Sequence, residues 1–160
     1  MSQKTRNFGL WMAVTLIAVL LASPVRAGGS QVTQGSFTPF ELGPILGYST
    51  INGQATMIRT GSGMTIVVVT AGGLEAGLSY GSHVHNRACN DAGAGGHYSF
   101  GDTVPGGALD GTEIWPGPFT SNPAGNAAGF TQVGATAGLD AVSVVIHAPG
   151  GAKIACADLR

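Results

Sequence analysis

The feature that most constrains the fold of this chain is a series of short runs of β-branched residues separated by glycines. Glycine accounts for 27 of the 160 residues and often occurs in pairs, such as Gly72–Gly73 and Gly150–Gly151. The runs between the glycines are rich in Val, Ile and Thr, as in residues 55–59, 64–70 and 142–146. None of them keeps the 3.6-residue period of an amphipathic helix, and interior glycines disfavour helix. Short strands between glycine turns predict an all-β fold, an antiparallel sandwich or barrel.

The first 27 residues have the pattern of a secretory signal peptide. Lys4 and Arg6 form a basic start, residues 8–22 are predominantly apolar, and residues 23–27 end in a small-residue exit at Ala27. The alternative is a permanent membrane anchor, but the apolar run is short against the roughly 20 residues that span a bilayer. We therefore expect residues 28–160 to form one domain that is periplasmic or secreted, with no membrane attachment after cleavage.

The charge of residues 28–160 is low and mildly acidic. This part carries four basic side chains against eight acidic ones, which gives a net charge of −4 with neutral histidines. Binding to nucleic acid requires clustered Lys and Arg, and the sequence contains no such cluster. We therefore expect no nucleic-acid partner.

A long segment, residues 91–126, differs in composition from the rest of the chain. It is rich in Gly, Pro, Asp and Asn and has few apolar runs. Irregular segments of this length in a small domain are usually functional or disordered. Because this one contains a histidine and begins just after a cysteine, we interpret it as a functional loop.

Two cysteines, Cys89 and Cys156, lie in the expected domain. In an oxidising compartment an isolated pair of cysteines favours a disulfide over free thiols. The alternative is two buried thiols.

The chain has four histidines, and their spacing suggests part of a metal site. His83 and His85 are two residues apart, which places both imidazoles on one face of a strand. His147 ends a strand-like run, and His97 follows Gly95–Gly96, where the backbone can bend close to a metal. Imidazole binds copper, zinc, nickel or iron, and an all-nitrogen set favours copper(II). Spacing alone does not establish that the three segments meet, so isolated surface or core histidines are an open alternative.

Four segments resemble, in the same order, the motifs of the copper/zinc superoxide dismutases. Residues 73–85 are similar to the family's G-L-x-x-G-L-x-G-x-H-V-H segment, and Cys89 with residues 95–98 is similar to its cysteine and G-x-H-[FY] loop. Residues 144–148 resemble its V-V-[IV]-H strand, and residues 151–156 resemble its G-x-R-[IL]-A-C ending. The resemblance implies an immunoglobulin-like Greek-key β-barrel or sandwich of about eight antiparallel strands with long loops.

The resemblance also implies a chemistry. Superoxide would be converted to dioxygen and hydrogen peroxide at one copper ion, and His97, at the position of the family's bridging histidine, would carry a proton. The implied copper ligands are all four histidines, His83, His85, His97 and His147, and the implied disulfide joins Cys89 to Cys156.

The chain departs from the family pattern at the zinc site and before the C-terminal motif. No histidine lies between His97 and His147, and the few carboxylates there are a poor set of zinc ligands. Only Ala-Pro-Gly-Gly-Ala follows His147, and Lys153 then stands at the position of the family's active-site arginine. These departures resemble the copper-only branch of the family, so we expect copper and no zinc.

Further residues are expected to serve the site. Metal-bound imidazoles usually donate their far nitrogen to a carboxylate or carbonyl. Glu113 is the first candidate for holding His97 in this way and Asp110 the second, with a solvated loop carboxylate as the alternative. Lys153 is expected to guide superoxide, because an acidic protein needs a local positive charge to attract an anion. Trp115 is interpreted as a packing residue.

Two other functions are compatible with the sequence. A copper-binding or copper-buffering protein could use the same histidines without dismutation, and a structural or adhesive β domain could carry them incidentally. The sequence does not define whether the chain is a monomer or a dimer.

Overall fold

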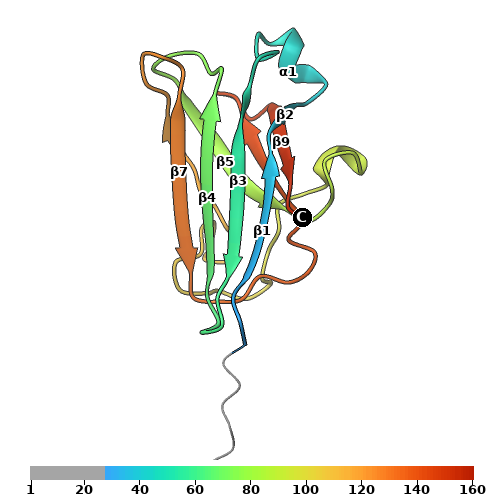
Figure 1. Cartoon of the computed structure of the whole chain (residues 1–160), viewed down its shortest axis with the longest axis vertical. Coiled ribbons are helices and arrows are strands. Elements are labelled where there is room, and N and C mark those ends of the chain that lie inside the picture. The colour runs from blue at the N-terminus through green and yellow to red at the C-terminus, as the bar shows by residue number, and fades with distance from the viewer. Residues whose placement is uncertain (1–27) are drawn as a thin grey trace, which may run out of the picture.

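The computed structural model describes residues 28–160, which form two β-sheets packed face to face (Figure 1). The predicted signal peptide, residues 1–27, lies outside the described residues. Within residues 28–160, none of the helices has the length and apolar character needed to cross a membrane.

Each sheet is antiparallel and contains strands from distant parts of the chain. The four-stranded sheet has the order β1 (Gln31–Ser36), β3 (Asn52–Arg59), β4 (Thr65–Gly72) and β7 (Ala127–Val133). The five-stranded sheet has the order β2 (Thr38–Pro39), β9 (Lys153–Asp158), β8 (Ser143–His147), β5 (Ser79–His85) and β6 (Phe119–Thr120). Two short helical segments complete the described elements, α1 (Leu42–Ile45) and the 3-10 turn η1 (Ala92–Ala94).

The connections between the sheets are of the Greek-key kind, and they confirm the expected all-β fold. β7 pairs with β4 in the first sheet, although β5 and β6, which lie between them in sequence, belong to the second sheet. The predicted run 55–59 falls in β3, and the runs 64–70 and 142–146 each begin one residue before β4 and β8. Residues 28–160 form nine strands, close to the expected number of about eight, and two of them, β2 and β6, are only two residues long.

The core lies between the two sheets and follows the two-residue period of the strands. Met57 and Val67 point inward from the four-stranded sheet, and Tyr80, Val84 and Val144 point inward from the five-stranded sheet; each is fully buried. Alternate residues therefore point to the outer faces.

A loop covers the outer face of the five-stranded sheet. All five residues of β8 are buried. Val144 and Ile146 face the core between the sheets, and the outward-facing Val145 is covered by the segment that follows β5. Ala94 of this segment packs with Val145 and Cys156 in a small apolar cluster of their own. The predicted disulfide between Cys89 and Cys156 is present and attaches the segment to β9. The loop that carries His97 is thus held against the strands that carry the other histidines.

Candidate metal centre

The four histidines converge on the outer face of the five-stranded sheet. His83 and His85 lie on either side of the inward-pointing Val84 on β5, so both rings point outward. His147 is the last residue of the neighbouring strand β8, which pairs with β5. An isolated antiparallel bridge between His85 and His97 brings the loop histidine to the same place.

One ring nitrogen from each of the four histidines lies within 4.8 Å of the others. The ring centroid of His83 is 4.0 Å from that of His97 and 4.6 Å from that of His147, and the His85 and His97 centroids are 5.0 Å apart. The structure therefore brings together all four side chains that the sequence singled out as metal ligands.

Hydrogen bonds fix the orientation of three of these rings. The Nδ1 atom of His85 lies 3.3 Å from the carbonyl oxygen of Ala94, and the Nδ1 atom of His147 lies 2.9 Å from that of Gly151. The Nδ1 atom of His97 lies 2.7 Å from Oε2 of Glu113. A carbonyl oxygen can only accept a hydrogen bond, so Nδ1 of His85 and of His147 carries the proton and Nε2 keeps its lone pair.

Three ring nitrogens at the centre are buried without a partner. Nδ1 of His83, Nε2 of His85 and Nε2 of His147 make no hydrogen bond to any of residues 28–160. Buried polar atoms are normally satisfied, and each exception requires an explanation. A metal ion with nitrogen ligands would satisfy these lone pairs, so the donor set fits a metal such as copper.

Burial keeps the central imidazoles neutral. Burial is the main reason why the pKa of His83 falls to about 3, with further contributions from the neighbouring histidines. Burial also lowers the pKa of His85 to about 3, with Lys153 and nearby histidines adding to the effect. The pKa of His147 is lowered by burial as well. Neutral imidazole is the form that binds metals, because protonation would occupy the lone pair.

The carboxylate beside His97 belongs to Glu113, the first of the two candidates. Its side chain is mostly buried, at 12 % exposure, whereas that of His97 is 30 % exposed. Asp110 lies elsewhere: it is an exposed turn residue with a positive φ of 58°, and its backbone oxygen accepts a hydrogen bond from Thr103. The structure therefore favours Glu113 over Asp110 as the partner of His97.

Trp115 takes part in the site in a way that the sequence interpretation missed. Its ring packs against His83 at a centroid distance of 4.4 Å, as expected of a packing residue. In addition, its Nε1 donates a hydrogen bond of 2.7 Å to Oε2 of Glu113. The signal available in the sequence was the spacing of two residues between Glu113 and Trp115, which places both side chains on one side of an extended segment.

Lys153 lies beside the site and is bound to the loop. It pairs with His147 across β8 and β9, and its Nζ donates hydrogen bonds of 2.7 Å to the carbonyl oxygens of Gly93 and Gly95. Gly95 has a positive φ of 65°, and a Cβ atom there would lie 2.5 Å from Oδ1 of Asn86. Lys153 therefore ties β9 to the glycine-rich turn just before His97.

A cavity of about 470 Å³ opens onto the histidines. Three of the four, His83, His97 and His147, line it, and the other lining residues are small: Ser79, Gly81, Ala148, Pro149, Gly150 and Gly151. A small solute can therefore reach this side of the histidine cluster.

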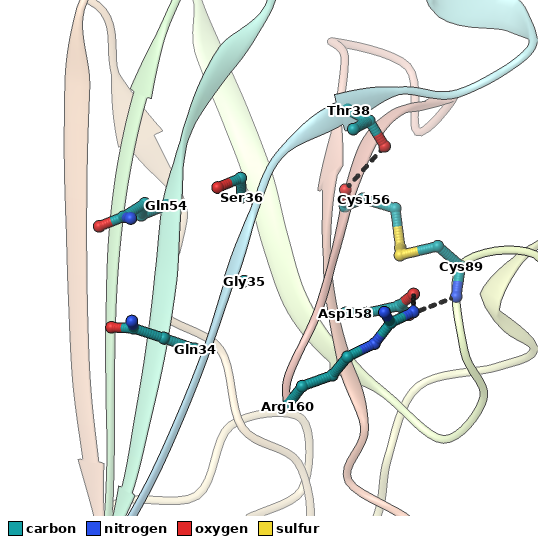
Figure 2. A pocket seen from close by; sticks show the side chains of 9 residues that line it. All are labelled: Gln34, Gly35, Ser36, Thr38, Gln54, Cys89, Cys156, Asp158 and Arg160. Carbon is teal, nitrogen blue, oxygen red and sulfur yellow. Dashed lines mark hydrogen bonds and ion pairs between the residues drawn. A yellow bond between two sulfur atoms is a disulfide. The ribbon is translucent and has the colours of Figure 1, made fainter.

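A second hollow, of about 390 Å³, lies next to the disulfide between β1 and β9. Figure 2 shows that its charged groups are already paired: Asp158 accepts a 2.7 Å hydrogen bond from the backbone N–H of Cys89 and forms a 3.0 Å ion pair with Arg160. The sulfur atoms of Cys89 and Cys156 are bonded to each other. This hollow therefore offers no free thiolate for a metal, and the histidine cluster is the candidate site.

Comparison with solved structures identifies the fold. Superoxide dismutase 5 of Candida albicans in a copper(II) form aligns with a TM-score of 0.56 and 18 % identity, over 81 % of this chain and 91 % of that one. A variant of the same protein with a glutamate replaced by glutamine aligns with a TM-score of 0.57 and 17 % identity, over 82 % and 91 %. A glutamate-to-alanine variant gives 0.53 and 17 %, over 81 % and 88 %. This chain has the superoxide dismutase fold.

The superoxide dismutase fold agrees with the resemblance of the four sequence motifs. No protein-family model matches the chain, and no curated protein matches it in sequence. At 17–18 % identity the structural likeness concerns the fold, and the chemistry has to be argued from the site itself.

Proposed function

We propose that this chain is an exported superoxide dismutase that binds one copper ion through His83, His85, His97 and His147 and binds no zinc. The observation that carries the proposal is the convergence of four imidazoles, of which three present buried nitrogens without a protein partner. An all-imidazole set favours copper(II). All four histidines of the chain are used in this set, which leaves no imidazole for a zinc site.

Bound copper would supply one-electron exchange with superoxide, and the protein supplies access and a proton. The cavity over the histidines is lined mainly by small residues, so it can admit a small anion. His97 lines this cavity, and its Nδ1 is engaged by Glu113. Nε2 of His97 is therefore the nitrogen that would bind copper, and the same atom is proposed to take up and deliver a proton when it is not bound to the metal.

Lys153 is proposed to attract the anionic substrate. The acidic chain repels anions at long range, and a local positive charge beside the site offsets this repulsion. The two carbonyl oxygens that bind the ammonium group of Lys153 hold this charge next to the loop of His97.

An extracytoplasmic location, in the periplasm or outside the cell, is part of the proposal. The disulfide supports it, because disulfides persist mainly in oxidising compartments.

The test is to load residues 28–160 with copper, count bound metals and measure superoxide removal. We expect one copper ion per chain, no zinc, and catalytic dismutation that is lost in His147→Ala. Asp110→Asn is the control, because it changes an exposed carboxylate of the loop that carries His97, and it should behave like the unaltered protein. Absence of stoichiometric copper would overturn the proposal.

A second readout separates the enzyme from a copper-buffering protein. An enzyme needs a position at which an anion can reach the metal, so the copper(II) absorption spectrum should change when azide is added. Copper binding without dismutation and without an azide response would instead favour the buffering function.

A further inference from the structure

Trp115 contacts two of the proposed ligands in different ways. Its ring centroid lies 4.4 Å from that of His83, with the planes tilted by 43°, and 6.1 Å from that of His97, with the planes nearly perpendicular at 88°. Its indole N–H donates to Oε2 of Glu113 at 2.7 Å. Trp115 therefore reaches His83 by packing and His97 through a carboxylate.

The same carboxylate oxygen serves both Trp115 and His97. Oε2 of Glu113 lies 2.7 Å from Nε1 of Trp115 and 2.7 Å from Nδ1 of His97. A carboxylate oxygen has two lone pairs, so it can accept both hydrogen bonds at once. Hydrogen bonds to a charged acceptor are stronger than those between neutral groups. The two donors together fix this oxygen more firmly than His97 alone would.

The backbone of this segment is anchored on both sides of the pair. Glu113 exchanges two backbone hydrogen bonds of 2.9 Å with Ala108, and the carbonyl oxygen of Ile114 accepts a 3.0 Å bond from Val84 of β5. Ile114 is fully buried. Because side chains alternate along an extended segment, Glu113 and Trp115 lie together on the side opposite Ile114. They therefore meet the histidines that flank Val84.

We propose that Trp115 is a positioning residue of the metal site. Its indole N–H holds the carboxylate of Glu113 in the orientation that orders His97, and its ring holds His83. Two of the four ligands are thus ordered before copper binds. This inference rests on the proposed function for its effect on copper, while the hydrogen bond itself can be tested in the metal-free protein.

The first test is the indole resonance of the metal-free protein. Of the two tryptophans in the sequence, only Trp115 lies in residues 28–160, which contain every described strand. The ¹H–¹⁵N NMR spectrum of this part should show one indole N–H peak that exchanges slowly with solvent. Glu113→Gln should shift this peak strongly, whereas Asp110→Asn should leave it in place. An indole proton that exchanges as fast as that of free tryptophan would overturn the proposal.

The second test separates the N–H from the ring at the bound copper. Trp115→Phe keeps an aromatic ring against His83 but removes the donor, and Trp115→Ala removes both. We expect copper(II) to bind several-fold more weakly to Trp115→Phe, with an altered EPR spectrum and a shifted reduction potential, and more weakly still to Trp115→Ala. Phe130→Leu, an exposed aromatic on β7, is the control and should leave all three quantities unchanged.

A role in packing alone predicts a different pattern. Trp115→Phe would then match the unaltered protein in affinity, EPR spectrum and potential, and this result would overturn the proposal. Failure of the unaltered protein to bind copper would overturn the proposed function instead, and the indole resonance would still decide whether Trp115 holds Glu113.

Discussion

Glu113 is the single residue whose charge should matter most to the proposed copper site. Glu113→Gln keeps the shape and one acceptor oxygen but removes the charge that stabilises Nδ1–H of His97. Loss of such a hydrogen-bond partner of a metal ligand typically lowers metal affinity roughly 10–100-fold. We expect a loss of this size in a competition titration with a copper chelator, with Asp110→Asn as control. Equal affinity of Glu113→Gln and the unaltered protein would contradict this prediction.

The residues of the site differ in how far the sequence could predict them. The histidines stand in ordered motifs, and a strand period of two puts His83 and His85 on one face, so their convergence could be expected. The sequence ranks Glu113 above Asp110 without excluding Asp110, because both lie in an irregular loop whose path depends on tertiary contacts. The two-residue spacing of Glu113 and Trp115 indicates that both side chains lie on one side of the segment, but their hydrogen bond also depends on tertiary contacts that place the carboxylate.

Lys153 connects β9 with the loop of His97. Its replacement should therefore loosen the attachment of this loop as well as remove a positive charge. Lys153→Met removes the two bonds to the carbonyls of Gly93 and Gly95 and the positive charge next to the site. We expect a slower reaction with superoxide and a weaker dependence of the rate on ionic strength, because screening acts on charge attraction. Pulse radiolysis at several salt concentrations measures both.

Two matched variants test the role of Lys153. Lys153→Arg keeps the charge and should retain most of the rate. Arg160→Gln removes a charge beside the second hollow, which the histidines do not line, and should change little. Rates of Lys153→Met equal to those of the unaltered protein at every ionic strength would remove Lys153 from this role.

The disulfide between Cys89 and Cys156 attaches the start of the same loop to β9. Cys89 and Cys156 are 67 positions apart in sequence, so their link restricts a long stretch of the unfolded chain. By the chain-entropy model such a link contributes about 4 kcal/mol to the free energy of unfolding. We expect the double variant Cys89→Ser with Cys156→Ser to lose stability of this order in urea unfolding at low temperature. Unchanged stability of the double variant would contradict this prediction.

The elements themselves were predictable to the extent that they are long and apolar. β3, β4 and β8 coincide with runs of β-branched residues, which favour strands wherever one face is buried. β2, β6 and α1 have two to four residues each, too few for any periodicity to appear. Their positions depend on what they pair with, such as β2 with Cys156 and Ala155 of β9, and such pairing is a tertiary property.

At the scale of the whole molecule, the fold holds several imidazoles in a buried place where they resist protonation. The strands and the covering loop bury His85 fully and His83 in part, and burial lowers the pKa of each to about 3. In the unfolded chain both would have an ordinary pKa of about 6.5. Well above pH 6.5 they are neutral in both states and contribute no pH dependence. Below it, the unfolded chain takes up protons that the folded protein does not.

The stability of the metal-free protein should therefore fall as the pH decreases from 6.5 toward 3. The window from pH 7 to 5 isolates the histidines, because ordinary carboxylates stay largely ionised there. In this window unfolding should take up at least two protons per molecule once the pH is well below 6.5, from His83 and His85, with a further contribution from His147, whose pKa burial also lowers. The slope of the unfolding free energy against pH gives this number. Urea unfolding at closely spaced pH values measures this slope, and His83→Gln should lower it by about one proton. A free energy of unfolding that stays constant from pH 7 to 5 would mean that the buried rings accept protons as readily as exposed ones, and that the fold does not keep them ready for a metal.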